Sequence, residues 1–299
     1  MGISAVHMDG LRLTTSSEQP SITDITPFDT PFFSMMKSQK VHNRVYQYQS
    51  DSLRAPASNA QVEGADATIN ALTPTTMLSG TTQILTEAFQ VAATADVTST
   101  YGRAKDTAYA LGRALKSIKR DLEHAMIGAS NAQVAGNNSA SPVAREMDSC
   151  DQLIDAATTE AGGTAALTET MLLNLGQKCF NEGADPTIFM IKPADAIIVS
   201  NFTASAGRNR TFNDDNKTLT AAVDVYVGPF GTYKTVLNRH QMTDHAFLLD
   251  PSMWRSAVLR PFSRSLLAKT GDSEKHFVVG EYGLMHMNQK GSGMINALT

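Results

Sequence analysis

Three polar side chains near residue 240 are the first candidates for metal ligands. His240, Asp244 and His245 carry the imidazole and carboxylate groups that bind zinc and other transition metals. Their spacing, HxxxDH, corresponds to no motif with a known mechanism, and most single histidines are surface or core residues. We therefore expect a structural role for all three.

Two further clusters contain a nucleophile or soft ligands. The triplet GDS at residues 271–273 resembles the surroundings of a catalytic serine, but no glycine pair that could form an oxyanion hole follows it, and His276 lies on a predicted strand. Met285 and Met287 could bind copper(I), but on an alternating strand they point the same way, as core residues do. Because phosphate-binding glycine motifs are also missing from the sequence, we predict no enzyme activity, no metal and no cofactor.

The strongest structural signal is one long helix predicted over Tyr101–Ser130, which ends near Gly128. It would span roughly 40 Å. Apolar side chains recur along it in steps of three and four, at Ala108, Leu111, Leu115, Ile118, Leu122 and Ala125. Basic side chains occupy the remaining positions, among them Arg113, Lys116, Lys119 and Arg120.

Composition limits the class of protein. The 299 residues allow one large domain or two smaller ones, and no apolar run approaches the roughly 20 residues of a membrane span. No signal peptide is apparent, and two isolated cysteines, Cys150 and Cys179, fit a reducing compartment. The predicted helix and residues 255–299 each carry six basic and three acidic residues, whereas residues 45–100 carry one base and five acids. A face that combined the two basic segments could contact a polyanion, although ordinary surface scatter explains the pattern as well.

The first 40 residues are predicted to form a docking arm. Two Thr-Pro steps favour extended geometry. Phe28, Phe32 and Phe33 are too apolar for a free tail, so they should dock on this subunit's body or on a neighbour.

The next segment is predicted to form a projecting hairpin. Its expected strands are Val41–Ser50 and Thr81–Val97, with a polar tip between them. The tip's acids, Asp51, Glu63 and Asp66, face a single base, Arg54. Such a tip would suit a basic edge of a neighbouring subunit, for instance the Arg103–Arg120 side of its long helix.

Residues 150–250 are predicted to form a compact α/β unit. Thr168 is a plausible N-cap for a helix that ends at Gly183, and a buried strand over Thr187–Ile191 follows. Further predicted elements are a helix over Ala194–Phe202, a surface loop over Gly207–Thr218, a hairpin from Val223–Val227 and Thr232–Leu237, and strands at Ala246–Asp250, Trp254–Leu259, Ser265–Lys269 and His276–Met287.

This ordered set resembles the major capsid proteins of tailed bacteriophages that have the Hong Kong 97-type fold. The resemblance rests on TPF at Thr30–Phe32, the long helix at Tyr101–Gly128, ARE at Ala144–Glu146, GADPTIFMIKP at Gly183–Pro193, VDVYVGPFGTYKTVLNR at Val223–Arg239, and the stretch Asp250–Asn288. It covers most of the chain, and the arm and the hairpin tip match least.

The resemblance implies an α+β fold in four parts. These are an N-terminal arm (1–40), an extended β-hairpin loop (41–100), a peripheral domain with a spine helix (101–149 and 251–299) and an α/β axial domain (150–250). It further implies inter-subunit contacts through Phe28, Phe32, Phe33, Asp51, Arg54, Glu63 and Asp66, and a genome-facing surface at Arg113, Lys116, Lys119 and Arg120.

The function implied is that of a major capsid protein. Copies would form hexamers and pentamers and close into an icosahedral shell around double-stranded DNA, bound without sequence specificity. Assembly would occur in the cytoplasm of the host bacterium. Further expected partners are a portal protein and a scaffolding protein supplied in trans, because arm and hairpin fill everything before the spine helix.

Covalent cross-linking is not expected. Some relatives join a lysine of the extended loop to an asparagine of a neighbour, but no lysine lies between Lys40 and Lys105 here. Two other functions stay open: an encapsulin-like nanocompartment shell and an α/β hydrolase-like enzyme. Particle formation would exclude the enzyme, and nucleic acid content would separate the two shells.

Overall fold

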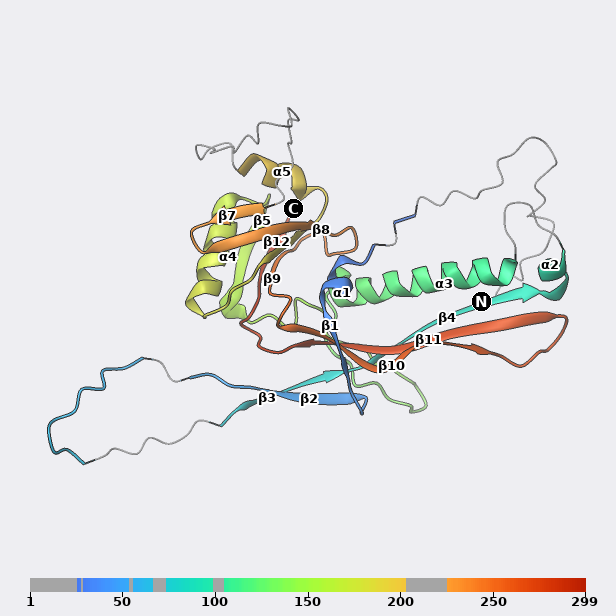
Figure 1. Ribbon diagram of the computed structural model, residues 1–299, viewed down its shortest axis with the longest axis horizontal. Coiled ribbons are helices and arrows are strands. Elements are labelled where there is room, and N and C mark those ends of the chain that lie inside the picture. Colours follow the sequence, from blue (N-terminus) through green and yellow to red (C-terminus); the bar gives the residue numbers. More distant parts are fainter. Residues whose placement is uncertain (1–25, 28, 54–55, 67–73, 99–104, 203–224) are drawn as a thin grey trace, which may run out of the picture.

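The computed structural model describes residues 26–27, 29–53, 56–66, 74–98, 105–202 and 225–299. Helices and strands combine into an elongated sheet with one long helix lying along it, a compact second sheet with its own helices, and a hairpin that projects beyond both (Figure 1). No helix in these ranges is long and apolar enough to cross a membrane.

The elongated sheet has the strand order β1-β10-β11-β4. Its two long central strands, β10 and β11, pair antiparallel, and the edge strand β1 of the arm pairs parallel to β10. The strands are β1 (Lys37–Lys40), β4 (Gln83–Ala92), β10 (Trp254–Leu266) and β11 (Ser273–His286). Short helices α1 (Pro31–Met35) and α2 (Ala93–Val97) lie near opposite ends of the long helix (Figure 1).

The long helix, α3 (Asp106–Glu123), lies along one face of this sheet and continues as a π-helix over His124–Gly128. Ile118 and Leu122 of the predicted apolar stripe are buried. Ala108, which was predicted to belong to the stripe, is exposed, whereas Ala114, which was not, is buried. The helix ends near Gly128 as predicted. A Cβ atom there would lie 2.3 Å from the carbonyl oxygen of His240, so only glycine fits. The predicted first turn, residues 101–104, lies outside the described residues.

The second sheet has six strands in the order β5-β12-β9-β6-β8-β7. They are β5 (Thr159–Ala165), β6 (Ile188–Ile191), β7 (Val225–Gly228), β8 (Gly231–Leu237), β9 (Ala246–Leu249) and β12 (Gly293–Leu298). Its helices are α4 (Glu169–Asn181), α5 (Asp195–Phe202) and a 3-10 turn at Ala156–Thr158. Thr168 caps α4 as predicted, since its hydroxyl oxygen accepts a hydrogen bond from the Met171 amide at 3.3 Å. The predicted loop over Gly207–Thr218 lies outside the described residues.

Two strand pairings in the structure were not predicted. Strand β2 (Val45–Ser50) of the hairpin pairs with β3 (Thr76–Thr81), whereas β4, which was expected to return the hairpin, pairs with β11. No strand was predicted after residue 287, but residues 293–298 form β12, which lies between β5 and β9 of the six-stranded sheet. In both cases a distant segment offers the hydrogen-bonding edge, which local patterns do not reveal.

The largest core joins the two sheets. It contains Phe32 of the arm, Leu122 of α3, Met190 and Phe247 of the six-stranded sheet, and Trp254 of β10. A second core lies within the six-stranded sheet and its helices α4 and α5. Because one core is shared, the arm, α3 and both sheets support one another.

Candidate assembly surfaces

The projecting hairpin (residues 45–81) is fixed at its root by Tyr46. The Tyr46 ring packs against Gly80 and Gly283, where an added Cβ atom would lie 2.5 Å and 2.7 Å from ring or hydroxyl atoms of Tyr46. The Tyr46 hydroxyl donates a hydrogen bond to the carbonyl oxygen of Leu284 at 2.6 Å, and burial raises its pKa. The glycines therefore let the hairpin pack closely against β11.

A buried carboxylate also fixes this region. Glu281 of β11 is only 6% exposed and pairs with Arg260 of β10 and with Arg145, whose guanidinium lies 3.0 Å away. Arg145 belongs to the connector (residues 129–149) that follows the π-helix. A second guanidinium nitrogen of Arg145 reaches the hydroxyl of Thr82 at 3.4 Å, beside the end of β3. Sheet, connector and hairpin root are thus linked through one salt-bridge network.

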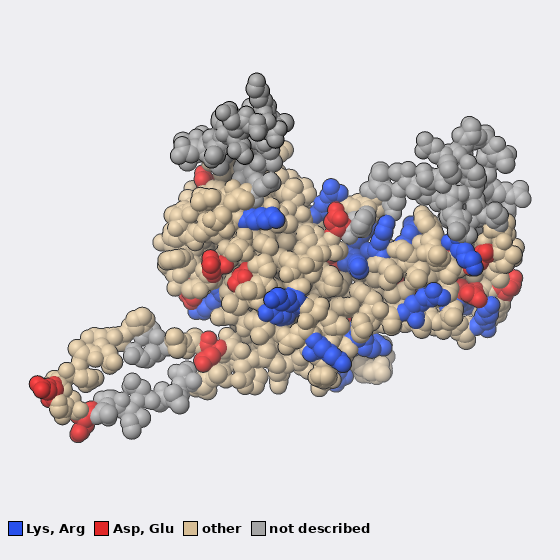
Figure 2. All heavy atoms as spheres, viewed as in Figure 1, with Lys and Arg blue, Asp and Glu red and all other residues tan. Residues whose placement is uncertain are grey.

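The described part of the hairpin tip, residues 51–53 and 56–66, has few contacts with its own subunit. Asp51, Glu63 and Asp66 are exposed, and acidic side chains gather at the far end of the hairpin in Figure 2. Leu53 is 98% exposed and Val62 is 81% exposed. Arg54 lies outside the described residues. The tip therefore presents apolar and acidic groups together. From the sequence, only the acids were predicted to take part in a contact.

The predicted basic surface lies on the long helix. Arg113, Lys116 and Lys119 are exposed and Arg120 is half-buried. The Arg113 guanidinium lies 6.0 Å from the centre of the Tyr109 ring, in cation–π range. Lys and Arg side chains are frequent over this part of the molecule (Figure 2).

The arm docks on its own subunit. Phe32 has no exposed surface, and its ring meets Trp254 edge-on with a centroid distance of 5.5 Å. Phe33 is half-buried and meets Tyr282 in the same way at 6.1 Å. In this conformation Phe32 packs within its own subunit, one of the two alternatives left open by the sequence, and its predicted inter-subunit role stays a prediction. Phe28 lies outside the described residues.

A buried carboxylate that sequence analysis missed meets the arm. Glu123, at the last turn of α3, is 0% exposed. It accepts hydrogen bonds from the Phe32 and Phe33 amides, both at 2.8 Å, and from the Asn238 side chain at 2.7 Å. Burial raises the pKa of Glu123, and these three hydrogen bonds oppose the rise. One signal was available: an acid beside the apolar stripe at a helix C-terminus, where the helix dipole disfavours negative charge.

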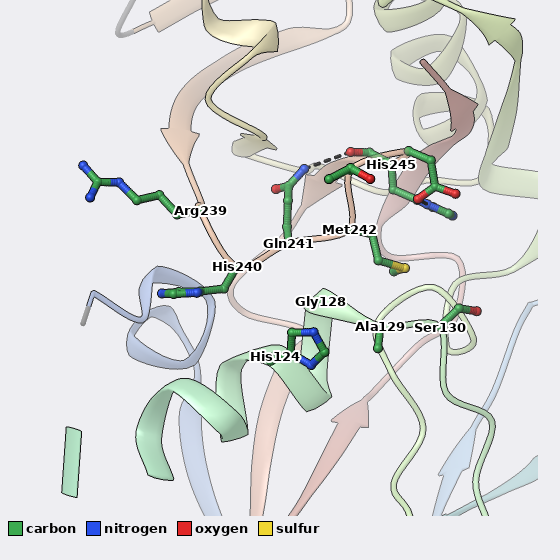
Figure 3. A pocket seen from close by; sticks show the side chains of 11 residues that line it. His124, Gly128, Ala129, Ser130, Arg239, His240, Gln241, Met242 and His245 are labelled. Atoms are coloured by element: carbon green, nitrogen blue, oxygen red, sulfur yellow. Dashed lines mark hydrogen bonds and ion pairs between the residues drawn. The ribbon is translucent and has the colours of Figure 1, made fainter. Parts of the chain in front are cut away.

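A hollow of about 540 Å³ lies beside this junction, between the end of α3 and residues 239–245 (Figure 3). It contains the histidines considered as metal ligands, but their rings diverge: His240 points away from His245. His245 instead contacts the Asp244 carboxylate at 2.8 Å, and the Gln241 amide donates to the carbonyl oxygen of His245 at 2.8 Å. Within the described part of the chain, no three His, Cys, Asp or Glu side chains are grouped to hold a metal.

The other chemical candidates are structural residues. The Ser273 hydroxyl accepts a hydrogen bond from the Gln90 amide at 2.6 Å. His276 is buried against Phe89, and neither of its ring nitrogens has a hydrogen-bond partner among the described residues, so it does not activate Ser273. Met285 is buried beside Tyr46 at the hairpin root, as expected of a core residue.

Solved structures share this architecture. The capsid of a native GTA particle matches with a TM-score of 0.68 and 11% identity, covering 99% of both chains. The structure of Mycobacterium phage Adephagia matches with a TM-score of 0.62 and 14% identity, covering 100% of this chain and 99% of that one. An encapsulin complex from Synechococcus elongatus matches with a TM-score of 0.61 and 9% identity, covering 99% and 96%. The fold is the mixed α+β, Hong Kong 97-type fold of capsid shells, as the sequence predicted.

Sequence comparison defines the family. The major capsid protein of Escherichia phage Phieco32 is 29% identical over 322 residues, covering 92% of this chain and 91% of that protein. Residues 8–299 match the SU10 major capsid protein family, and the chain belongs to that family. It is therefore a major capsid protein of a phage: a structural component of the virion capsid that associates with its own copies. The nanocompartment alternative shares the fold, but the family supports the capsid assignment.

Proposed function

We propose that copies of this chain form hexamers and pentamers that close into an icosahedral head shell around double-stranded DNA. The observation that carries the proposal is the projecting hairpin, whose tip exposes Leu53 and Val62 beside three acids and has few contacts with its own subunit. Apolar side chains held this far from the subunit's core are suited to burial against a second copy. The peripheral and axial roles predicted for the two sheets belong to the same proposal.

The hairpin tip is proposed to contact a basic edge of a neighbouring subunit. Asp51, Glu63 and Asp66 provide the negative charge, and Leu53 and Val62 provide apolar surface. Each exposed ion pair contributes about 0–1 kcal/mol, whereas full burial of a leucine or valine contributes about 1.5–3 kcal/mol. The two apolar side chains would therefore supply most of the contact energy, and the acids its orientation.

The exposed basic face of α3 is proposed to lie toward the packaged genome. Arg113, Lys116, Lys119 and Arg120 could neutralise phosphates without reading sequence. The wider proposal includes assembly in the bacterial cytoplasm with a separate scaffolding protein and a portal protein, and no membrane partner.

The test replaces Leu53–Pro74 with a short Gly-Ser turn. We expect a soluble subunit that melts cooperatively in circular dichroism but does not sediment as closed particles. A matched variant, Leu53→Ser with Val62→Ser, should weaken assembly while leaving the charge intact. Charge reversal at Glu63 and Asp66 should weaken it most at low salt, where screening is least. Closed particles formed by the deletion variant would refute the assembly role of the hairpin, and unfolding would place the hairpin in the core.

Charge reversal on the helix separates its two proposed partners. If the basic face contacts DNA alone, Lys116→Glu with Lys119→Glu should give closed shells with reduced nucleic acid content. If it receives the hairpin tip, the same variant should fail to form shells. Sedimentation combined with the ratio of absorbance at 260 nm to that at 280 nm distinguishes the outcomes.

A further inference from the structure

Glu123 joins three segments that are distant in the sequence. One carboxylate oxygen accepts hydrogen bonds from the Phe32 amide and from the Asn238 side chain, and the other accepts from the Phe33 amide. The Phe32 and Phe33 amides belong to the arm segment (residues 29–40), and Asn238 directly follows β8 of the six-stranded sheet. While the arm is docked, Glu123 has no exposed surface, and these three donors stand in place of water.

Asn238 connects this carboxylate to the six-stranded sheet. It is also 0% exposed, and its backbone amide donates to the carbonyl oxygen of Ile191 at the end of β6, at 3.0 Å. Its side-chain oxygen accepts from the His240 amide at 2.8 Å and so shapes the loop over residues 238–245. The side-chain nitrogen of Asn238 therefore donates to Glu123, and its side-chain oxygen accepts from the loop.

The same loop contacts the end of the long helix. The Met242 amide donates to the carbonyl oxygen of Ile127 in the π-helix at 3.0 Å, and the carbonyl oxygen of His240 packs against Gly128. Glu123 is the residue directly before this π-helix. The attachment of the six-stranded sheet to α3 and the docking of the arm thus meet at one buried side chain.

We propose that Glu123 is a positioning residue that couples docking of the arm segment to the seating of the 238–245 loop on α3. Release of the arm removes two of the carboxylate's three donors and uncovers Glu123, so water can compete with Asn238 for the carboxylate. A hydrogen bond exposed to water contributes little net stability, so the remaining contact with Asn238 weakens as well. By linkage, disturbance of Asn238 weakens arm docking by the same factor.

Because of this coupling, the arm segment and the 238–245 loop should loosen together. Any partner that binds the released arm would also loosen the contact between the six-stranded sheet and the long helix. Conversely, a neighbour that shifts the 238–245 loop would favour arm release. All of these contacts lie within one subunit, so the coupling does not depend on how copies of the chain pack in a shell.

Site-resolved amide hydrogen exchange of the full-length subunit tests the coupling. Asn238→Ala does not touch the arm, yet we expect it to raise exchange at the Phe32 and Phe33 amides by roughly tenfold, within the roughly 5- to 150-fold range of such couplings. Phe32→Ala, which weakens arm docking, should raise exchange at the Met242 amide by a similar factor. Glu281→Gln is the matched control: it alters another buried carboxylate that contacts neither segment, and both should keep their protection.

Glu123→Gln supplies a second measurement if Asn238→Ala fails to fold. The amide has a similar shape but only one accepting oxygen, so it cannot satisfy donors at both positions. We expect a folded subunit in which arm and loop lose protection together. Unchanged exchange at Phe32 and Phe33 in Asn238→Ala, with faster exchange confined to the loop, would show two independent contacts and overturn the proposal. Loss of protection at only one segment in Glu123→Gln would do the same.

Discussion

Truncation of Phe32 is the most direct test of whether the arm belongs to the subunit's own fold. The side chain has no exposed surface and lies in the core that joins both sheets, edge-on to Trp254. Phenylalanine to alanine at such a site costs about 3–5 kcal/mol, because burial energy is lost and a cavity remains. Phe32→Ala should therefore lower the free energy of unfolding by an amount in this range.

The arm's position in the chain sets an upper limit to this loss. Phe32 lies in the short helix α1, which is followed only by the four-residue edge strand β1 before the chain turns into the hairpin. The truncation destabilises only the docked arm. If the free energy of docking this segment is smaller than the roughly 3–5 kcal/mol expected for the truncation, the segment detaches, and the free energy of unfolding falls only by the docking free energy. Detachment would also lower the urea m-value, since less surface would remain to be exposed on unfolding.

Urea unfolding of the unassembled full-length subunit, followed by circular dichroism, measures both quantities. Phe33→Ala is the graded control, because Phe33 is half-buried and should cost less. Leu53→Ala, at a side chain that is 98% exposed, should stay within about 0.5 kcal/mol of the parent. Equal stability of Phe32→Ala and the parent would refute the reasoning and return Phe32 to the inter-subunit role expected from the sequence.

Three further outcomes follow from individual contacts. Burial lowers the pKa of His286 to about 4, so between pH 6.5 and 4 the unfolded chain binds a proton that the folded one does not. Urea titrations should therefore show about 2 kcal/mol of stability lost at pH 5 relative to pH 7.5, and His286→Asn should lack this component; equal losses would contradict the assignment. Gly283→Ala should displace Tyr46 and abolish closed particles in sedimentation, whereas Gly112→Ala, with open space around it, should not. Finally, boiled particles should run as one monomer band in denaturing electrophoresis, since no lysine lies between Lys40 and Lys105; a ladder resistant to reductant would contradict this.

Local signals in the sequence predicted the helices and strands that depend on near neighbours. The cap at Thr168, the stop near Gly128 and the buried strand β6 all follow from short-range chemistry: a hydroxyl near an unpaired amide, a site without room for Cβ, and a run of apolar residues. The order of such elements, together with the motifs that resemble capsid proteins of the Hong Kong 97-type fold, predicted the fold.

Pairing over long distances could not be predicted in the same way. The alternating pattern over residues 81–97 indicated a strand, and β4 is one, but its partner β11 lies about 190 residues further along the chain. The true return strand, β3, has the sequence TMLSGT, in which apolar and polar residues do not alternate, so its sequence carries little signal. Likewise, the apolar arm had to dock somewhere, but only the structure distinguishes Trp254 of the same subunit from a neighbour's surface.

Glu123 was missed for a related reason. Its carboxylate is satisfied by two backbone amides and one side-chain amide from segments 90 or more residues away. Backbone amides leave no mark in the sequence, so an acid with such partners looks like any exposed acid of a charged helix. A functional residue that depends on distant backbone donors can be recognised only once the fold is known.

The rigid root of the hairpin explains how an exposed tip could still contribute to assembly. Ordering a flexible side chain at an interface costs about 0.5–1.5 kcal/mol, which would offset much of the gain from burying Leu53 and Val62. Tyr46 and the Glu281 network fix the base of the hairpin before any partner arrives, so the remaining cost falls on the tip alone. Loosening the root should therefore weaken assembly even though every group at the tip is unchanged. Gly283→Ala tests this expectation, because it displaces Tyr46 at the root and leaves the proposed contact at the tip intact.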